Sequence, residues 1–267
     1  MKRLEAVIFD WAGTTVDWGS LAPVRALTQL FANHGIQLSE SDVRKDLGLF
    51  KKDHIRKILA LEQVDAEWQR QRGKPASEQD VEAIFLNFMP MQMAILDEYA
   101  VLIDGMAGLA KELRKRGLKL GGTTGYTRPM LDLLLARAEA QDYRPDQSLC
   151  PDDVGGGRPF PWMCLRLALN FQLSSTASAV KVGDTVSDIQ EGLNAGMWSV
   201  GVTATGNEVG LGKSQLTALS HEERNRRMNQ ARETLLSAGA HYVIDSVTHL
   251  EPVLEQIQQR LAAGDRP

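Results

Sequence analysis

The chain has 267 residues, of which 43% are apolar and 24% are charged, a composition typical of globular proteins rather than of disordered or fibrous chains. Its formal net charge of −4 argues against a dedicated nucleic-acid-binding protein, which would usually be basic. No apolar run approaches the ~18 residues that a membrane span needs, and the first predicted strand begins too near the N-terminus to leave room for a signal peptide.

The first predicted element is a strand of four apolar residues, Ala6 to Phe9, which Asp10 follows directly. A continuous apolar run of this length is typical of a strand that is buried on both faces of a parallel sheet. A carboxylate after such a strand lies at the carboxyl edge of the sheet, where open α/β folds bind their ligands. A single Asp in this position is more often a turn or a helix cap. The sharp turn that Gly13 allows nevertheless favours an acid that is placed for chemistry.

The next part of the chain, residues 19–98, has helical periodicity and little strand character. It interrupts the α/β pattern directly after the first strand, so we expect a helical insert at the carboxyl edge of the sheet, a position that suits a lid over a site. The expected helices cover residues 23–34, a short segment from Ser39 to near Gly48, residues 51–72 and residues 77–99.

From residue 99 onward, apolar runs alternate with helical segments, which predicts parallel βαβ units and an α/β fold with a Rossmann-like parallel sheet. Residues 1–18 and 99–267 would form the catalytic core, and residues 19–98 the cap domain. The expected strands are 118–123, 148–150, 180–183, 198–202 and 242–244, and the expected helices include 105–116, 128–141 and 161–170.

A second acidic motif follows the strand at 180–183. Asp184 comes directly after that strand, and Asp188 lies one turn along the helix that begins there. The carboxyl ends of parallel strands meet at one edge, so these two residues and Asp10 are expected to converge. Three adjacent carboxylates need a cation, and hard oxygen ligands favour Mg²⁺, which would also bind a phosphoryl or phosphonyl group.

Two further residues are expected at this edge. Thr124 follows the strand at 118–123 and can donate its hydroxyl to a bound phosphoryl group. Arg158, which follows three glycines, can supply a positive charge. Taken singly, each of these residues reads as an ordinary loop residue, and the prediction depends on their joint pattern.

The joint pattern resembles the haloacid dehalogenase superfamily, on the segments Asp10 to Thr14, Thr124-Gly125, Arg158 and Gly183 to Asp188. The resemblance implies that Asp10 is a nucleophile that becomes an aspartyl-phosphate. It also implies that Asp10, Asp184 and the backbone carbonyl of Ala12 hold Mg²⁺, with Asp188 supporting the metal site through water.

Ala12 departs from the phosphatases of that superfamily, which usually carry a second Asp two residues after the nucleophile. That Asp acts as a general acid for an alkoxide leaving group, and such assistance contributes roughly 10²–10⁴-fold. A methyl group cannot donate a proton. Either the protein is impaired, or its leaving group needs no proton from this position.

Lys51 supports the second alternative, a leaving group that needs no proton from position 12. A lysine amine can condense with an aldehyde, and the resulting iminium ion can accept the electron pair of a breaking phosphorus–carbon bond. The amine must be neutral, and its position at a helix start beside Lys52 and a metal-bearing pocket is expected to lower its pKa from ~10.4. His54 lies on the same helix face and can move protons. Alone, Lys51 would more often be solvated and His54 structural.

With these residues included, the chain resembles the phosphonatases, a family within that superfamily, over the segments 6–17, 48–54, 123–127, 151–154, 157–163 and 182–188. The resemblance implies cleavage of 2-phosphonoacetaldehyde, a small-molecule phosphonate, to acetaldehyde and phosphate. It makes Lys51 the Schiff-base lysine and places His54 and Tyr126 in the pocket as aids to proton transfer. It also implies a Mg²⁺-dependent homodimer. Leu47 and Ser20 depart from some relatives, which carry methionine and cysteine there.

Other functions stay open at this point. A phosphatase or phosphomutase acting on a phosphate ester is disfavoured by Ala12, and a dehalogenase by the metal-type carboxylates such as Asp184. A binding or scaffold protein is disfavoured because Asp10, Lys51 and Asp184 are all present. The two cysteines, Cys150 and Cys164, form neither a metal motif nor a disulfide framework, so we expect a reduced, cytoplasmic setting.

Overall fold

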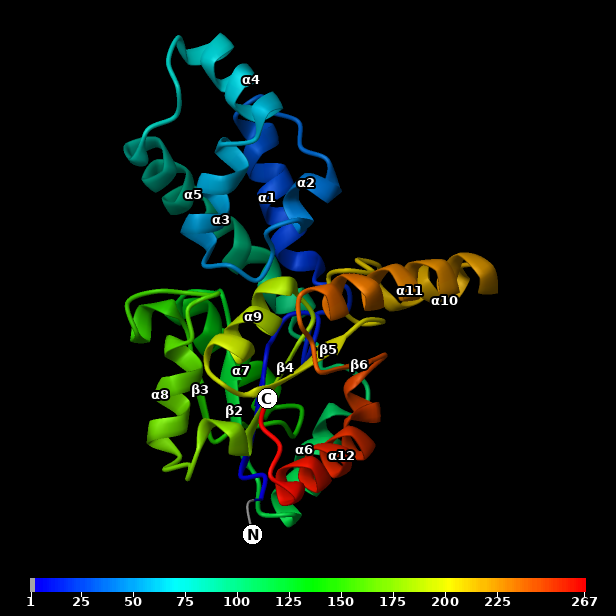
Figure 1. Ribbon diagram of the computed structural model, residues 1–267. Coiled ribbons are helices and arrows are strands. Elements are labelled where there is room, and N and C mark those ends of the chain that lie inside the picture. Colours follow the sequence, from blue (N-terminus) through cyan, green and yellow to red (C-terminus); the bar gives the residue numbers. More distant parts are fainter. Residues whose placement is uncertain (1–2) are drawn as a thin grey trace.

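A parallel sheet in the order β3-β2-β1-β4-β5-β6 forms the centre of the computed structural model, which describes residues 3–267 (Figure 1). The α/β fold with a Rossmann-like parallel sheet is therefore confirmed. The strands are β1 (Ala6–Phe9), β2 (Lys119–Thr123), β3 (Gln147–Leu149), β4 (Ala179–Gly183), β5 (Trp198–Val202) and β6 (Tyr242–Ile244).

Strand β1 is central and fully buried because helices cover both faces of the sheet. Its side chains alternate between the faces: Val7 and Phe9 belong to one apolar cluster, and Ala6 and Ile8 to another. The helices on the first face are α6 (Met106–Lys115), α7 (Arg128–Glu139) and α12 (Leu250–Ala263). Those on the second face are α8 (Trp162–Asn170), α9 (Val186–Asn194) and α11 (His221–Ser237), and the short α10 (Lys213–Ala218) precedes α11.

Five helices form a separate lobe above the carboxyl edge of the sheet (Figure 1). We call this lobe, residues 21–99, the cap, and the rest of the chain the core. The two connections to the core run side by side, since Val16 bridges to Leu102 and the amide of Ile103 donates to the carbonyl of Thr15 at 2.9 Å. The cap helices are α1 (Leu21–Asn33), α2 (Glu40–Arg44), α3 (Lys51–Leu59), α4 (Glu62–Arg72) and α5 (Glu78–Tyr99).

The single helix predicted over residues 51–72 is wrong, because the chain breaks between α3 and α4 at Ala60 and Leu61. The reason is a change of phase in the apolar pattern. At about 100° per residue, Val64 lies roughly 180° around a continuous helix from Ile55. Both side chains are buried, so the helix must break for both of them to reach the apolar core.

The cap and the core meet at glycines that leave no room for a side chain. A Cβ on Gly125, in the loop after β2, would lie 2.3 Å from the carbonyl oxygen of Leu49 and 2.7 Å from that of Gly48, both in the cap. A Cβ on Gly48 would lie 2.5 Å from Oγ1 of Thr185, in the core. The loop before α3 is therefore seated directly between two loops of the core.

We predict that Gly125→Ala keeps the core folded but prevents the cap from seating. The backbone of Gly125 is not left-handed, so alanine fits its own position, and the clash falls only on the backbone of Leu49 and Gly48. X-ray scattering should show a larger radius of gyration than in the wild type. Gly108→Ala is the control, because a Cβ there meets nothing within 4 Å. Identical scattering from wild type and Gly125→Ala would contradict the prediction.

Candidate active site

Asp10, Thr124 and Asp184 follow the three adjacent strands β1, β2 and β4, as the sequence predicted. The register places Phe9 opposite Gly122 on one side and opposite Val182 on the other, so the residues after each strand arrive at the same edge. Carboxylate oxygens of Asp10, Asp184 and Asp188 lie within 4.8 Å of one another, and all three side chains are buried. The expected convergence of these acids is thus present in the structure.

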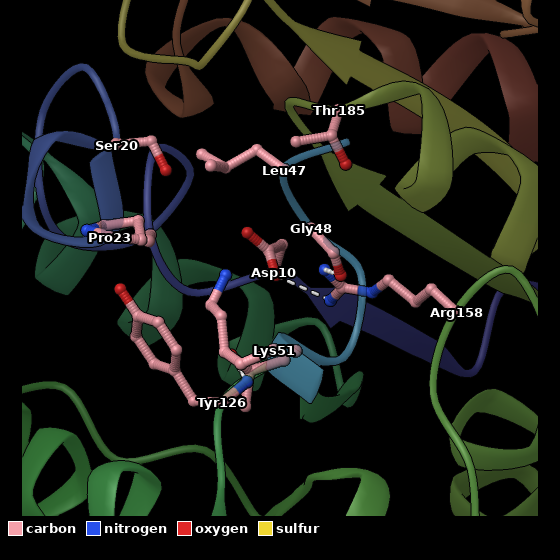
Figure 2. A pocket seen from close by; sticks show the side chains of 12 residues that line it. Asp10, Ser20, Pro23, Leu47, Gly48, Lys51, Tyr126, Arg158 and Thr185 are labelled. Carbon is pink, nitrogen blue, oxygen red and sulfur yellow. Dashed lines mark hydrogen bonds and ion pairs between the residues drawn. The ribbon is translucent and has the colours of Figure 1, made fainter. Parts of the chain in front are cut away.

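Asp10 and Thr124 line a small cavity between the core and the cap, whereas Asp184 and Asp188 are not among its lining residues (Figure 2). Its volume is about 20 Å³, room for about one water molecule, so a larger ligand does not fit in this arrangement of the cap and the core. Leu47 and Ser20, the two departures noted in the sequence, both line this cavity. The lining comprises Asp10, Ala12, Ser20, Pro23, Leu47, Gly48, Lys51, Thr124, Gly125, Tyr126, Arg158 and Thr185.

Lys51 reaches the cavity from the cap and faces the same space as Asp10 (Figure 2). It is the first residue of α3, only 2% of it is exposed, and its amine lies 5.3 Å from the ring centroid of Tyr126. Burial lowers the pKa of Lys51 to about 8, and the positive charge of Arg158 adds to this, whereas Asp10 opposes it. A substantial fraction of this amine is therefore neutral near pH 8, unlike that of a solvated lysine.

Thr124 lines the cavity as predicted, whereas His54, which was also expected in the pocket, is not among the residues that line it. His54 is fully buried one turn after Lys51, and burial together with the charge of Lys51 lowers its pKa to about 3. The imidazole is therefore neutral at physiological pH. The hydroxyl oxygen of Thr124 accepts a hydrogen bond from the amide of Tyr126 at 3.2 Å, which leaves its proton available for another acceptor.

Arg158 is buried beside the nucleophile candidate rather than exposed on its loop. Its Nη2 donates to Oδ1 of Asp10 at 2.6 Å and to the carbonyl of Thr123 at 2.8 Å. Its Nε donates to Oε2 of Glu191 at 2.9 Å, and its Nη1 lies 3.0 Å from Oδ1 of Asp188. The guanidinium thus spans three carboxylates and fixes the orientation of Asp10.

Sequence reasoning missed Lys181 and Glu191, which are both fully buried. Val180 and Val182 point to one face of β4, so Lys181 must point to the other, beneath α9. There its amine lies 2.7 Å from Oδ1 of Asp188 and 3.4 Å from Oε2 of Glu191. The sequence signal that could have revealed this cluster is a lysine between two valines in a predicted buried strand, because a buried charge needs oppositely charged partners.

Asp184 is the acid that lacks a cation. Its oxygens accept hydrogen bonds from the hydroxyl of Thr14 at 2.9 Å and the amide of Asn207 at 2.8 Å, and no Lys or Arg of residues 3–267 lies within ion-pair distance. Burial raises the pKa of Asp184 well above its usual range, and the charges of Asp10 and Asp188 raise it further. A cation here would relieve this repulsion.

The donor set fits a hard divalent metal. Asp10 and Asp184 contribute carboxylates, and within the described part of the chain the carbonyl oxygen of Ala12 accepts no hydrogen bond. Asp188 differs, because Lys181 and Arg158 occupy its Oδ1, and the Thr185 hydroxyl donates to its Oδ2 at 2.6 Å. These contacts suit a residue that supports the metal site rather than one that binds the ion directly.

A further acid that sequence reasoning did not assign is Asp17, in the connection that leads from β1 into the cap. Its oxygens accept hydrogen bonds from the amides of Leu21 and Ala22, both at 3.0 Å, so it caps α1. Burial raises the pKa of Asp17 to about 7, against the opposing effect of these hydrogen bonds. This residue therefore anchors the first cap helix beside the cavity.

Comparison with known proteins agrees with this geometry. A family model described as haloacid dehalogenase-like hydrolase matches residues 4–196. The chain is 41% identical over 264 residues to a protein of Syntrophobacter fumaroxidans named phosphonoacetaldehyde hydrolase, covering 99% of this chain and 95% of the relative. It is 42% identical over 258 residues to a protein of the same name from Bacillus cereus strain AH187, covering 97% and 98%.

Solved structures show the same likeness. A phosphonoacetaldehyde hydrolase-like protein from Oleispira antarctica superposes with a TM-score of 0.97 at 41% identity, covering 99% of this chain and 96% of that one. A putative β-phosphoglucomutase from Bacteroides vulgatus shares the fold at a TM-score of 0.68 and 19% identity, covering 97% and 91%. Among residues 3–267, none of the helices has the length and apolar character of a membrane span.

We predict that Lys181→Met lowers the free energy of unfolding by about 3–5 kcal/mol at neutral pH, because Asp188 and Glu191 lose a buried counter-charge. Urea unfolding followed by circular dichroism measures the change. Lys111→Met is the control: Lys111 pairs with Asp142 at 3.2 Å but is 62% exposed, so its loss should cost less than about 1 kcal/mol. Equal effects would show that the buried amine is not needed.

Proposed function

The chain belongs to the haloacid dehalogenase-like hydrolases, and we propose that it hydrolyses the carbon–phosphorus bond of 2-phosphonoacetaldehyde to acetaldehyde and phosphate. The observation that carries the proposal is the meeting of Lys51 and Asp10 in one cavity. An amine that captures the aldehyde and a carboxylate that attacks phosphorus must reach the same small molecule, and the shared cavity of Lys51 and Asp10 supports this arrangement. The names of the relatives from Syntrophobacter and Bacillus support the same substrate.

Ala12 supports a carbon leaving group over an oxygen one. Its methyl group lines the cavity where a phosphatase would need a proton donor for the departing alkoxide. Carbon needs no such donor if its electrons pass to an iminium nitrogen. The absence of an acid at Ala12 and the presence of a buried amine at Lys51 therefore both support a carbon leaving group.

The first step takes place at Lys51. The neutral amine adds to the aldehyde carbon and water leaves, which gives an iminium ion on Nζ. The low pKa of this amine, about 8, keeps a useful fraction ready for addition. We assign proton transfer in this step to the neutral imidazole of His54 and the hydroxyl of Tyr126.

The second step takes place at Asp10. A carboxylate oxygen attacks phosphorus, the phosphorus–carbon bond breaks, and its electron pair moves toward the iminium nitrogen to give an enamine. Arg158 holds Oδ1 of Asp10 at 2.6 Å, and Thr124 can donate to a phosphoryl oxygen. Protonation of the enamine at carbon and hydrolysis release acetaldehyde from Lys51, and water releases phosphate from Asp10.

We further assign Mg²⁺ to the site formed by Asp10, Asp184 and the carbonyl of Ala12, with Asp188 supporting it. When bound, the ion would neutralise negative charge on the phosphoryl group and the adjacent carboxylates. We treat residues 19–98 as a mobile cap domain on a core of residues 1–18 and 99–267, since the cavity is too small to admit substrate otherwise. A cytoplasmic homodimer completes the proposal, on the resemblance to the family.

The direct test measures phosphate release from 2-phosphonoacetaldehyde. We expect turnover with Mg²⁺, loss of turnover in EDTA and recovery when Mg²⁺ is restored. Glucose 1-phosphate should react at least ~10²-fold more slowly, because Ala12 cannot protonate an alkoxide. Faster turnover of the sugar phosphate than of the phosphonate would favour a phosphatase and reject the proposal. Tight phosphonate binding without turnover would favour a binding protein.

Reductive trapping tests the lysine. With substrate and cyanoborohydride, the peptide that contains Lys51 should gain a stable adduct by mass spectrometry. Because burial lowers the pKa, the neutral fraction rises about tenfold per pH unit below pH 8 and levels off above it, and the trapping rate should follow. Lys52→Met is the matched control and should still be labelled, since Lys52 pairs with Glu82 elsewhere in the cap. Carbon–phosphorus cleavage without any adduct would refute the role of Lys51.

A further inference from the structure

Arg44 is a cap residue whose guanidinium group lies against the core. It ends α2, and its side chain crosses to the loop between β5 and α10, residues 203–212. Its Nη1 donates to the carbonyl of Gly19 at 3.0 Å and to Oδ1 of Asn207 at 3.2 Å, and its Nη2 donates to the carbonyl of Gly210 at 2.9 Å. The side chain is only 13% exposed, so these bonds are made largely away from water.

Asn207 hydrogen-bonds both to Arg44 and to Asp184, the proposed metal ligand. Its Nδ2 donates to the backbone carbonyl of Arg44 at 3.1 Å, so the two residues bind each other in both directions. Its backbone amide donates to Oδ2 of Asp184 at 2.8 Å. Asn207 is 3% exposed and Asp184 is fully buried, which leaves neither of them free to reorient in solvent. An unbroken series of hydrogen bonds therefore joins the cap to the acid that lacks a cation.

We propose that Arg44 is a positioning residue for Asp184, acting through Asn207, so that seating of the cap and binding of a divalent metal strengthen each other. The inference rests on the proposed function only in taking Asp184 as a metal ligand. Residues that orient metal ligands typically change metal affinity 10–100-fold when they are replaced. By thermodynamic reciprocity, a cap that improves metal binding must itself be held closed more tightly by the metal.

The test uses Mn²⁺ alone, without substrate, and follows its binding to the full chain by electron paramagnetic resonance. Arg44→Met removes the guanidinium and keeps the alkyl stem, and we expect Mn²⁺ to bind about tenfold more weakly. Arg56→Met is the control: Arg56 is another cap arginine, which pairs with Glu78 at 2.7 Å inside the cap, and its replacement should leave Mn²⁺ affinity within about twofold of the wild-type value.

Asn207→Ala approaches the same contact from the core side and guards against misfolding of one variant. It should weaken Mn²⁺ binding to a similar degree, and the double variant should lose little more than either single one, because both remove one coupled unit. Additive losses would show that the two residues act independently and would overturn the proposal.

Reciprocity gives a second readout that a purely structural role would not change. Mn²⁺ should slow amide hydrogen exchange in the cap loop, residues 45–50, of the wild type, and this effect should be lost in Arg44→Met. If Arg44→Met loosens the cap but binds Mn²⁺ like the wild type, Arg44 is a latch alone and the coupling is wrong. Failure of the wild type to bind Mn²⁺ would remove the metal site and this inference together. Mn²⁺ coupling without phosphonate turnover would keep the inference and reject only the proposed substrate.

Discussion

Crowded negative charge at one edge of the sheet is the constraint around which this molecule is organised. Parallel strands bring Asp10 and Asp184 to the same edge, and the helix after β4 adds Asp188 and Glu191. Buried carboxylates so close together are costly unless cations accompany them. Within residues 3–267, Arg158 and Lys181 pair with Asp10, Asp188 and Glu191, and Asp184 has no cationic partner. This imbalance makes the edge a place for a metal and an anionic ligand.

Under the proposed function, the cap has a different role, which is to make Lys51 reactive. A solvated amine would be protonated at neutral pH, and among residues 3–267 Lys51 is the only lysine that lines the cavity. Seating the loop before α3 against Gly125 carries Lys51 into a dry space, where burial lowers its pKa. The same seating brings Arg44 onto the core. Under the proposed function, closure of the cap joins three events: the cavity forms, the amine of Lys51 loses part of its charge, and Arg44 engages Asn207, which hydrogen-bonds to the proposed metal ligand Asp184.

Ala12 and Lys51 are the two residues that distinguish this site from that of a phosphatase. Ala12 cannot act as the general acid that an oxygen leaving group requires, and under the proposed function Lys51 provides a sink for the electrons of a carbon leaving group. Neither change alone would give an efficient hydrolase of the proposed kind. Under the proposed function, their joint presence in one cavity connects the core, which carries the proposed nucleophile, with the cap, which carries the proposed Schiff-base lysine.

The sequence alone determined the fold class and the convergence of Asp10, Thr124 and Asp184 at one edge of the sheet, because a buried parallel strand has a continuous apolar run and these residues directly follow such runs. Only the tertiary structure revealed the break between α3 and α4, since that break depends on which apolar side chains share one core. Only the tertiary structure revealed the pairing of Lys181 with Asp188, 7 residues apart in the chain, and of Arg44 with Asn207, 163 residues apart. The periodicity of a sequence reports only on the strand or helix to which a residue belongs. The partner of a buried charge, or of a side chain between the cap and the core, comes from another element and is set by the tertiary structure.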